Sequence, residues 1–218
     1  MVARGQNAGA PAAPRPLAHR RAELAAPLLL ACGFGALSLM TVAIVSLLPA
    51  YLSTQQGLPM AAAGAATAAA AAASIPGNAC AAVLLRRGVR PGLLACSMLA
   101  CPALAAVTFA GAVPLPASIA AAAALIFAVG IAASAAYASL PKVTRLIDDL
   151  PLANGILVQL GSAGALVGPP IFAAITGLRH WHLIAYLITP AAIVSATAMA
   201  AATLTHRYRA DGASRQRR

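Results

Sequence analysis

Residues 24–52, LAAPLLLACGFGALSLMTVAIVSLLPAYL, contain no Asp, Glu, Lys or Arg and consist almost entirely of apolar side chains. At 1.5 Å per residue, a helix of this length exceeds the roughly 30 Å hydrocarbon core of a lipid bilayer. A continuous apolar run of this length is typical of a membrane-spanning helix and not of a helix in a soluble domain. The segment therefore predicts a helix that crosses a membrane.

The same property extends over most of the chain. Residues 24–85, 91–141 and 150–178 all lack charged side chains, and 61% of the residues are apolar while 9% are charged. Soluble domains average roughly 45–50% apolar and about 25% charged residues, so lipid is the expected solvent. Turn and breaker residues divide the apolar runs into six segments. We predict an all-α integral membrane domain over residues 26–205, with six transmembrane helices at about 26–49, 60–85, 92–113, 117–140, 152–175 and 182–204.

The 15 Lys and Arg residues gather on one side of this predicted bundle. The loops after the second and fourth segments and the two terminal segments carry all of them except Arg179. The positive-inside rule therefore places both termini in the cytoplasm, and we expect the inner (plasma) membrane of a bacterium. Because the basic residues form short clusters between apolar runs, topology explains the net charge of +11 and no nucleic-acid partner is expected.

The two terminal segments lack the apolar character of the rest. Residues 1–25 are rich in Ala, Pro and Arg and are expected to form a disordered basic cytoplasmic tail, and residues 206–218 are expected to form a second one. A transit peptide is the alternative for the first segment. The prolines Pro11, Pro14 and Pro16 would break its amphipathic helix.

The sequence contains little that indicates catalysis or metal binding. There is no GxSxG or HExxH motif, and the adjacent acids Asp148 and Asp149 do not share a helix face. Trp181, between two histidines, is expected to be an interfacial anchor instead of part of a metal site. We predict that the chain is not an enzyme and uses no metal or other cofactor. Four cysteines without a CxxC pair are expected to be buried hydrophobes: Cys32, Cys80, Cys96 and Cys101.

The fifth segment carries the most specific pattern in the sequence. Gly164 and Gly168 form a GxxxG face that permits close packing against another helix, and Pro169 and Pro170 remove two backbone donors and loosen the helix. Packing alone is the simpler interpretation, and a helix that bends or rocks is the functional one. Together with Gly155, these residues resemble the fifth-helix pattern of antiporters in the major facilitator superfamily, which reads Gly, eight residues, Gly, three residues, Gly-Pro.

The loop after the second segment carries a second resemblance to this family. The family favours Gly, three residues, Asp, Arg, one residue, Gly and then basic residues, and Arg86, Gly88 and Arg90 fit that pattern. Leu85 stands in place of the family's aspartate and Ala81 in place of its first glycine. In the fifth segment, likewise, the family's trailing glycine pair is absent, so the pattern does not favour antiport specifically.

The resemblance implies one six-helix half of a major-facilitator-type fold, a 3+3 inverted repeat, because a complete family member has twelve spans. The degraded loop motif favours the C-terminal half, although the sequence permits the opposite assignment. The resemblance further implies transport of a small-molecule solute, by rocking against a second six-helix unit that is either another copy or a complementary half. A non-transporting truncated remnant or membrane scaffold is the alternative.

No predicted span contains an Asp, Glu, Lys or Arg, so solute contacts would fall to neutral polar side chains. Ser and Thr in membrane helices more often bond to their own backbone, and Asn78 is expected to bond to another helix or to line a wet cavity. The predicted solute-binding residues lie on the first, fourth and fifth segments: Ser38, Thr41, Ser134, Tyr137, Asn154 and Gln159.

Overall fold

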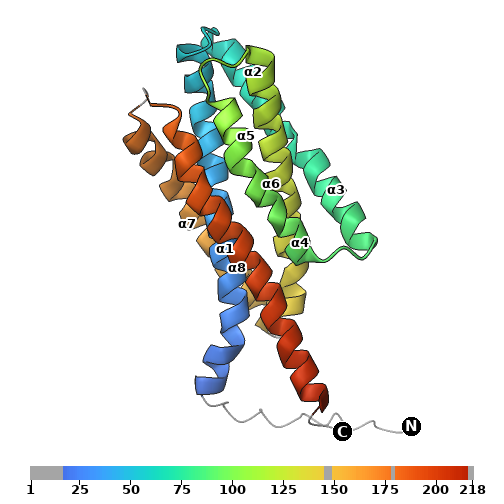
Figure 1. The fold of residues 1–218 in the computed structure, drawn as a ribbon. Helices are drawn as coiled ribbons and strands as arrows, with labels where there is room; N and C mark the ends of the chain where they lie inside the picture. The colour runs from blue at the N-terminus through green and yellow to red at the C-terminus, as the bar shows by residue number, and fades with distance from the viewer. Residues whose placement is uncertain (1–16, 145–148, 178–179, 216–218) are drawn as a thin grey trace, which may run out of the picture.

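The computed structural model describes residues 17–144, 149–177 and 180–215, with side chains described between residues 24 and 204. Every regular element in these ranges is helical, and the helices run roughly side by side (Figure 1). The helices are α1 (Leu17–Thr54), α2 (Met60–Ala72), α3 (Ser74–Arg86), α4 (Pro91–Ala95), the 3₁₀ helix η1 (Cys96–Ala100), α5 (Cys101–Thr108), α6 (Leu115–Val143), α7 (Leu150–Thr176) and α8 (Leu183–Arg215).

These helices supply six spans that are long and apolar enough to cross a membrane, which confirms the predicted six-transmembrane-helix architecture. The helices α1, α6, α7 and α8 each supply one span, α2 and α3 together form the second, and α4, η1 and α5 together form the third. The spans are Leu24–Thr54, Met60–Arg86, Pro91–Thr108, Leu115–Val143, Leu150–Thr176 and Leu183–Leu204.

Proline explains why the second and third spans are interrupted. Pro76 cannot donate to the carbonyl of Ala72, and the second span breaks at Ala73, whose amide turns back to Ala70 at 3.1 Å. Pro102 likewise cannot donate to Met98, and the third span tightens into 3₁₀ geometry just before it. Each span is therefore one continuous rod with a local irregularity at its proline.

The two terminal helices extend beyond the predicted spans. The first begins at Leu17, so residues 17–25, predicted to be disordered, are helical, and α8 continues to Arg215. Residues 17–26 contain no Gly or Pro and are rich in Ala, Leu and Arg, which favour helix. The third span, in contrast, ends at Thr108, short of the predicted residue 113. Residues 1–16 lie outside the described part of the chain.

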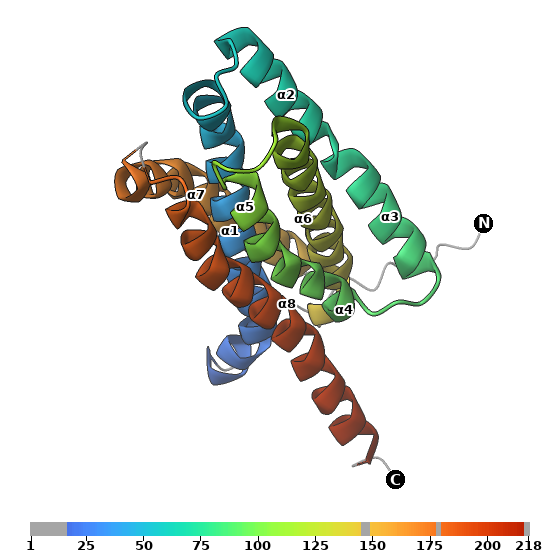
Figure 2. The same ribbon diagram turned by 45° about the horizontal axis from the view of Figure 1, so that its top comes forward.

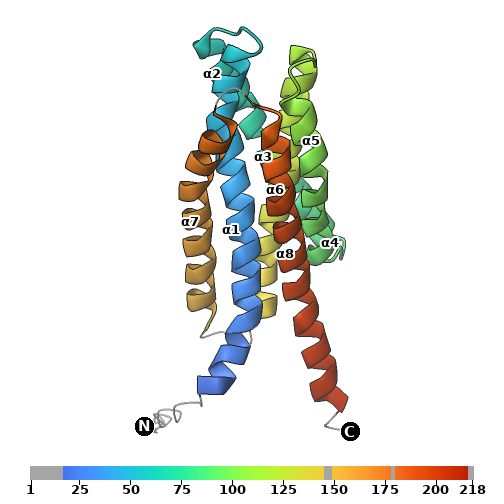
Figure 3. The ribbon, with the colours of Figure 1, turned by 60° about the vertical axis from the view of Figure 1, so that its left-hand side comes forward.

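The helices α1 and α6 are the central helices of the bundle. The first packs most extensively against α7 and then α8, with those two helices on either side of it (Figure 3). Helix α6 packs against α3 on one side and against α4 and α5 on the other (Figure 2). The third and sixth spans also contact each other.

The first, second and third spans correspond to the fourth, fifth and sixth in this packing. When each span is replaced by its counterpart, every one of these main pairings becomes another of them. Because three is an odd number of spans, the second set runs in the opposite direction to the first, which makes an inverted repeat. The predicted fold class, a six-helix bundle with a 3+3 arrangement, is confirmed. Both α1 and α8 have their terminal ends at the side of the bundle where α3 meets α4 (Figure 3).

Burial follows from this arrangement. Over its most apolar stretch, the fourth span is 56% buried, whereas the second is 17% buried and the fifth 22%. The second and fifth spans are therefore edge helices, each held mainly by one central helix. The prediction that all four cysteines are buried is wrong, since Cys32 and Cys96 are exposed. In lipid an apolar thiol does not have to be covered by protein.

An aromatic cluster closes the end of the bundle opposite the α3–α4 connection. Tyr51, Phe109 and Trp181 have ring centroids 5.0 to 6.4 Å apart. The tryptophan is only 3% exposed, and its ring packs into the core between the first, third and sixth spans. His180 and His182 beside it stay exposed, with ring centroids 6.0 Å apart.

Candidate functional site

A polar contact joins the second and fourth spans. The hydroxyl of Ser134 on α6 donates a hydrogen bond to the Oδ1 of Asn78 on α3 at 3.0 Å. The predicted bond between Asn78 and another helix is confirmed. Asn78 is nevertheless exposed in this bundle, and its amide NH₂ group has no other bonding partner among the described residues. The asparagine therefore retains two free donors.

Tyr137 extends this polar contact toward the first span. It lies three residues after Ser134 on α6, on the same helix face. Its ring packs edge to face with Phe34 of α1, with centroids 5.3 Å apart, and the residue is 46% exposed. The phenol hydroxyl has no hydrogen-bond partner within the described ranges. Tyr137 thus offers both an aromatic edge and a free polar group.

Phe34 connects this group to the first and fifth spans. Its ring lies directly over Gly161 of α7, where an added Cβ would be 2.6 Å from the Phe34 Cε1 atom. The same Cβ would be 3.4 Å from the hydroxyl of Ser38, one turn further along α1. Side chains of the first, second and fourth spans therefore meet here, with Gly161 of the fifth span against Phe34. We call this set the four-span cluster: Phe34, Ser38, Asn78, Ser134 and Tyr137.

Three of the predicted solute-binding residues lie outside this cluster. The hydroxyl of Thr41 donates to the carbonyl of Leu37 in its own helix at 2.6 Å, as Thr commonly does in membrane helices. Asn154 and Gln159 are exposed on α7 and make no hydrogen bond to other described residues. The structure thus brings Ser38, Ser134 and Tyr137 together and leaves the other three apart.

The glycines of the fifth span lie against the backbone of the first. A Cβ added to Gly164 would overlap the carbonyl oxygen of Gly35, and one added to Gly168 would overlap that of Leu39. Pro169 follows directly and is half-buried, and α7 remains helical through it to Thr176. Gly155, in contrast, has nothing within 4 Å of an added Cβ, so it takes no part in this contact.

A second glycine contact, which the sequence analysis missed, joins the second and fourth spans. A Cβ added to Gly77 of α3 would overlap the carbonyl oxygen of Phe127, and one added to Gly130 of α6 would be 2.6 Å from the carbonyl oxygen of Ser74. Each is the single glycine of its helix, and an isolated glycine inside a helix often has a packing reason. That signal could have identified both residues.

The loop between α3 and α4, which carries the second family resemblance, caps the end of α3. Gly88 has φ +84°, a conformation that side chains disfavour, and its amide donates to the carbonyl of Leu85 at 3.0 Å. Arg86 ends α3, and Arg90 is the residue before α4 begins. Both arginines are exposed, and the structure gives neither an ion pair with another described residue.

Six apolar spans in a 3+3 arrangement, with neutral polar side chains and backbone-to-backbone glycine contacts between them, define an integral membrane helical bundle. The sequence profile of the Major Facilitator Superfamily matches residues 4–218. The chain therefore belongs to this superfamily, a family of membrane transporters, and the resemblance seen in the sequence is confirmed. No curated protein and no solved structure matches the chain at a significant level.

Proposed function

We propose that the chain acts as one six-helix half of a secondary transporter, which moves a small solute by rocking against a second six-helix unit. The four-span cluster would form this half's share of the solute site. Its five members come from both three-span repeats, so a solute bound there would contact both repeats of this half while the second unit supplies the opposite wall.

The exposure of Asn78 and Tyr137 within apolar spans carries this proposal. An amide with free donors is expensive to leave facing lipid, because hydrocarbon offers it no hydrogen-bond partner. Asn78 lies eight residues inside the Arg86 end of its span, about 12 Å along the helix axis. This depth favours a face that meets water, a solute or another protein surface instead of lipid tails.

The edge helix α2 supports a protein partner beside that face. Apart from Met60 at its start, its exposed residues are alanines instead of the bulky side chains that fill lipid-facing surfaces. Small residues allow helix backbones to approach closely and pack by van der Waals contact. The exposed alanines of α2 are Ala61, Ala62, Ala65, Ala68, Ala69 and Ala72.

The chemistry of the cluster favours a solute that is recognised through hydrogen bonds and an aromatic edge. Asn78 supplies donors, Ser134 and Tyr137 supply hydroxyl groups, and no member carries a charge. The described spans contain no Asp or Glu, and their basic residues, Arg86 and Lys142, lie at span ends, so this half supplies no acidic proton relay. An ion-coupling residue, if the transporter uses one, belongs to the second unit.

Uptake by the full chain in proteoliposomes, measured across a panel of neutral polar solutes, tests the transport proposal. Tyr137→Phe and Asn78→Leu should each reduce uptake of a transported solute by about tenfold, because each removes hydrogen bonds from the site. Tyr186→Phe is the matched control, since Tyr186 is 71% exposed on α8 and is not part of the cluster. Absence of uptake for every solute would favour a non-transporting remnant or scaffold.

Cross-linking tests the second unit. Ala65→Cys, in a background without the four native cysteines, should form a disulfide-linked dimer in membranes if two copies pack through α2. A cysteine at exposed Val194 of α8 is the control and should not cross-link. Cross-linking at neither position, with only monomer by native mass, would leave a separately encoded half as the partner to be sought.

Orientation follows from the basic clusters, and we propose that both termini face the cytoplasm of a bacterial inner membrane. Reporter fusions in the Arg86–Arg90 loop and after Arg215 should report the same, cytoplasmic side. Reporters on opposite sides would contradict both the orientation and an even number of spans between these points.

A further inference from the structure

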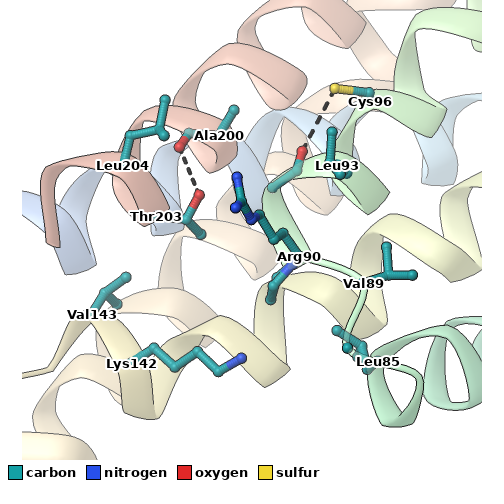
Figure 4. A pocket seen from close by; sticks show the side chains of 13 residues that line it. Leu85, Val89, Arg90, Leu93, Cys96, Lys142, Val143, Ala200, Thr203 and Leu204 are labelled. Atoms are coloured by element: carbon teal, nitrogen blue, oxygen red, sulfur yellow. Dashed lines mark hydrogen bonds between the residues drawn. The ribbon is translucent and has the colours of Figure 1, made fainter. Parts of the chain in front are cut away.

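A cavity of about 440 Å³ lies at the end of the bundle where α3 meets α4. It is bounded by the α3–α4 connection, the last turn of α6 and the α8 segment near residue 200 (Figure 4). Most of its wall is apolar, formed chiefly by Leu85, Val89, Leu93, Val143 and Leu204.

Two cationic side chains enter this cavity from separate elements. Arg90 comes from the start of α4 and Lys142 from the last turn of α6, and both extend into the cavity (Figure 4). No acidic residue is among the described residues of the lining, and neither cation forms an ion pair within the described part of the chain. Leu85, the lining residue at the end of α3, is apolar.

The cavity also lies at the level where the apolar spans end. The spans Met60–Arg86, Leu115–Val143 and Leu183–Leu204 finish at its rim, and Pro91–Thr108 begins there. In a bilayer, this level corresponds to the boundary between the hydrocarbon and the phospholipid headgroups. A ligand in the cavity would therefore meet charge at one side and apolar surface at the other.

We propose that this cavity binds an anionic phospholipid, with the headgroup phosphate between Arg90 and Lys142 and the part of the acyl chain nearest the headgroup against Leu93 and Leu204. Basic pockets between transmembrane helices are suited to anionic headgroups. The Arg guanidinium can bind phosphate oxygens through two parallel hydrogen bonds, and the Lys ammonium adds a compact charge. The apolar wall favours a lipid over a free anion, which could not use it.

Binding would join three elements that are far apart in sequence. The α3–α4 connection supplies Arg90, α6 supplies Lys142 and α8 supplies Leu204, so one lipid would link the second, third, fourth and sixth spans at this end. Because a ligand that binds only the folded state stabilises it by mass action, the stability of the bundle should depend on anionic lipid.

Thermal unfolding of the full chain in detergent, with added lipid, tests this site. Phosphatidylglycerol should raise the melting temperature, while phosphatidylcholine and inorganic phosphate should not. Arg90→Gln and Lys142→Gln should each weaken the apparent affinity for phosphatidylglycerol by about tenfold, since each removes a charge-assisted hydrogen bond. The two substitutions lie on different elements, so the test survives if one variant does not fold.

Arg87→Gln is the matched control. It removes the same charge from the same loop, but Arg87 does not line the cavity, and its effect should stay within about twofold. An equal loss of affinity in Arg87→Gln and Arg90→Gln would overturn the site in favour of a general basic surface. Equal stabilisation by phosphatidylcholine would also overturn it, and stabilisation by inorganic phosphate alone would replace the lipid with a soluble anion.

Discussion

Replacing Gly164 with alanine should force apart two helices whose backbones touch. The added Cβ would be 3.0 Å from the Gly35 carbonyl carbon and 3.2 Å from the Leu39 amide nitrogen, and it would overlap the Gly35 carbonyl oxygen, whereas ordinary contact begins at about 3.4 Å. Backbone atoms inside a helix cannot rotate away as a side chain can. We therefore expect α7 to shift outward from α1 along their shared face.

The size of the effect can be worked out by comparison with Gly155 on the same helix. Alanine is favoured over glycine inside a helix by about 1 kcal/mol, and this gain applies to both positions. At Gly155 nothing opposes it, because the space around an added Cβ is empty. At Gly164, the added Cβ pushes α7 away from α1, and overpacking of this kind costs about 1–3 kcal/mol. A gap of about 1 Å between the two helices forfeits a quarter to a half of each dispersion contact across it.

Gly164→Ala should therefore be about 1–3 kcal/mol less stable than Gly155→Ala, while Gly155→Ala equals or exceeds the unsubstituted chain. Denaturant titration in detergent micelles measures this difference, with the single tryptophan, Trp181, as the fluorescent probe and circular dichroism as the check on helix content. If both variants gained stability equally, the close approach of α1 and α7 would be refuted.

The same comparison applies to the second glycine contact: Gly77→Ala should be about 1–3 kcal/mol less stable than Gly64→Ala, whose added Cβ meets nothing, and equal stabilities would exclude the α3–α6 contact. A double-mutant cycle of Asn78→Ala and Ser134→Ala should give a coupling energy of about 0.6 kcal/mol, the usual strength of a hydrogen bond between membrane helices, and additive effects would mean that the bond does not form. Trp181→Phe removes a buried Nε1 that has no partner among the described residues, so unfolding measurements should show a change below about 1 kcal/mol, against a loss of about 3–5 kcal/mol for alanine. A phenylalanine variant as unstable as the alanine variant would show that the indole nitrogen is bonded.

The two glycine contacts occupy equivalent places in the two repeats. Each joins a central helix to its edge helix: α1 to α7 through Gly35 and Gly164, and α6 to α3 through Gly130 and Gly77. Backbone-to-backbone contact leaves little room for either pair to flex internally. Each pair should therefore move as one unit, which is the property that rocking of a whole six-helix half requires.

Much of the site was accessible from the sequence, and the parts that were not depended on helix rotation. Ser134 and Tyr137 were predicted as neutral polar residues of the fourth segment, and their spacing places them on one helix face. Asn78 was predicted to bond to another helix or to line a wet cavity. Whether Gln159 also faces the cluster depends on how α7 is rotated against α1. The glycines Gly161, Gly164 and Gly168 set that rotation, and Gln159 is left exposed.

The sequence alone determined that this chain crosses a membrane six times and belongs among the transporters, because uninterrupted apolar length, the distribution of basic residues and a short glycine-proline pattern are all local properties. Only the tertiary structure decided which helices are central, which glycines meet a neighbouring backbone, and that Phe34, Asn78 and Tyr137 lie together. Those outcomes depend on pairwise fit between helix surfaces far apart in sequence. In an alanine-rich membrane protein, apolar patterning distinguishes those surfaces poorly, because lipid and protein interior are almost equally apolar.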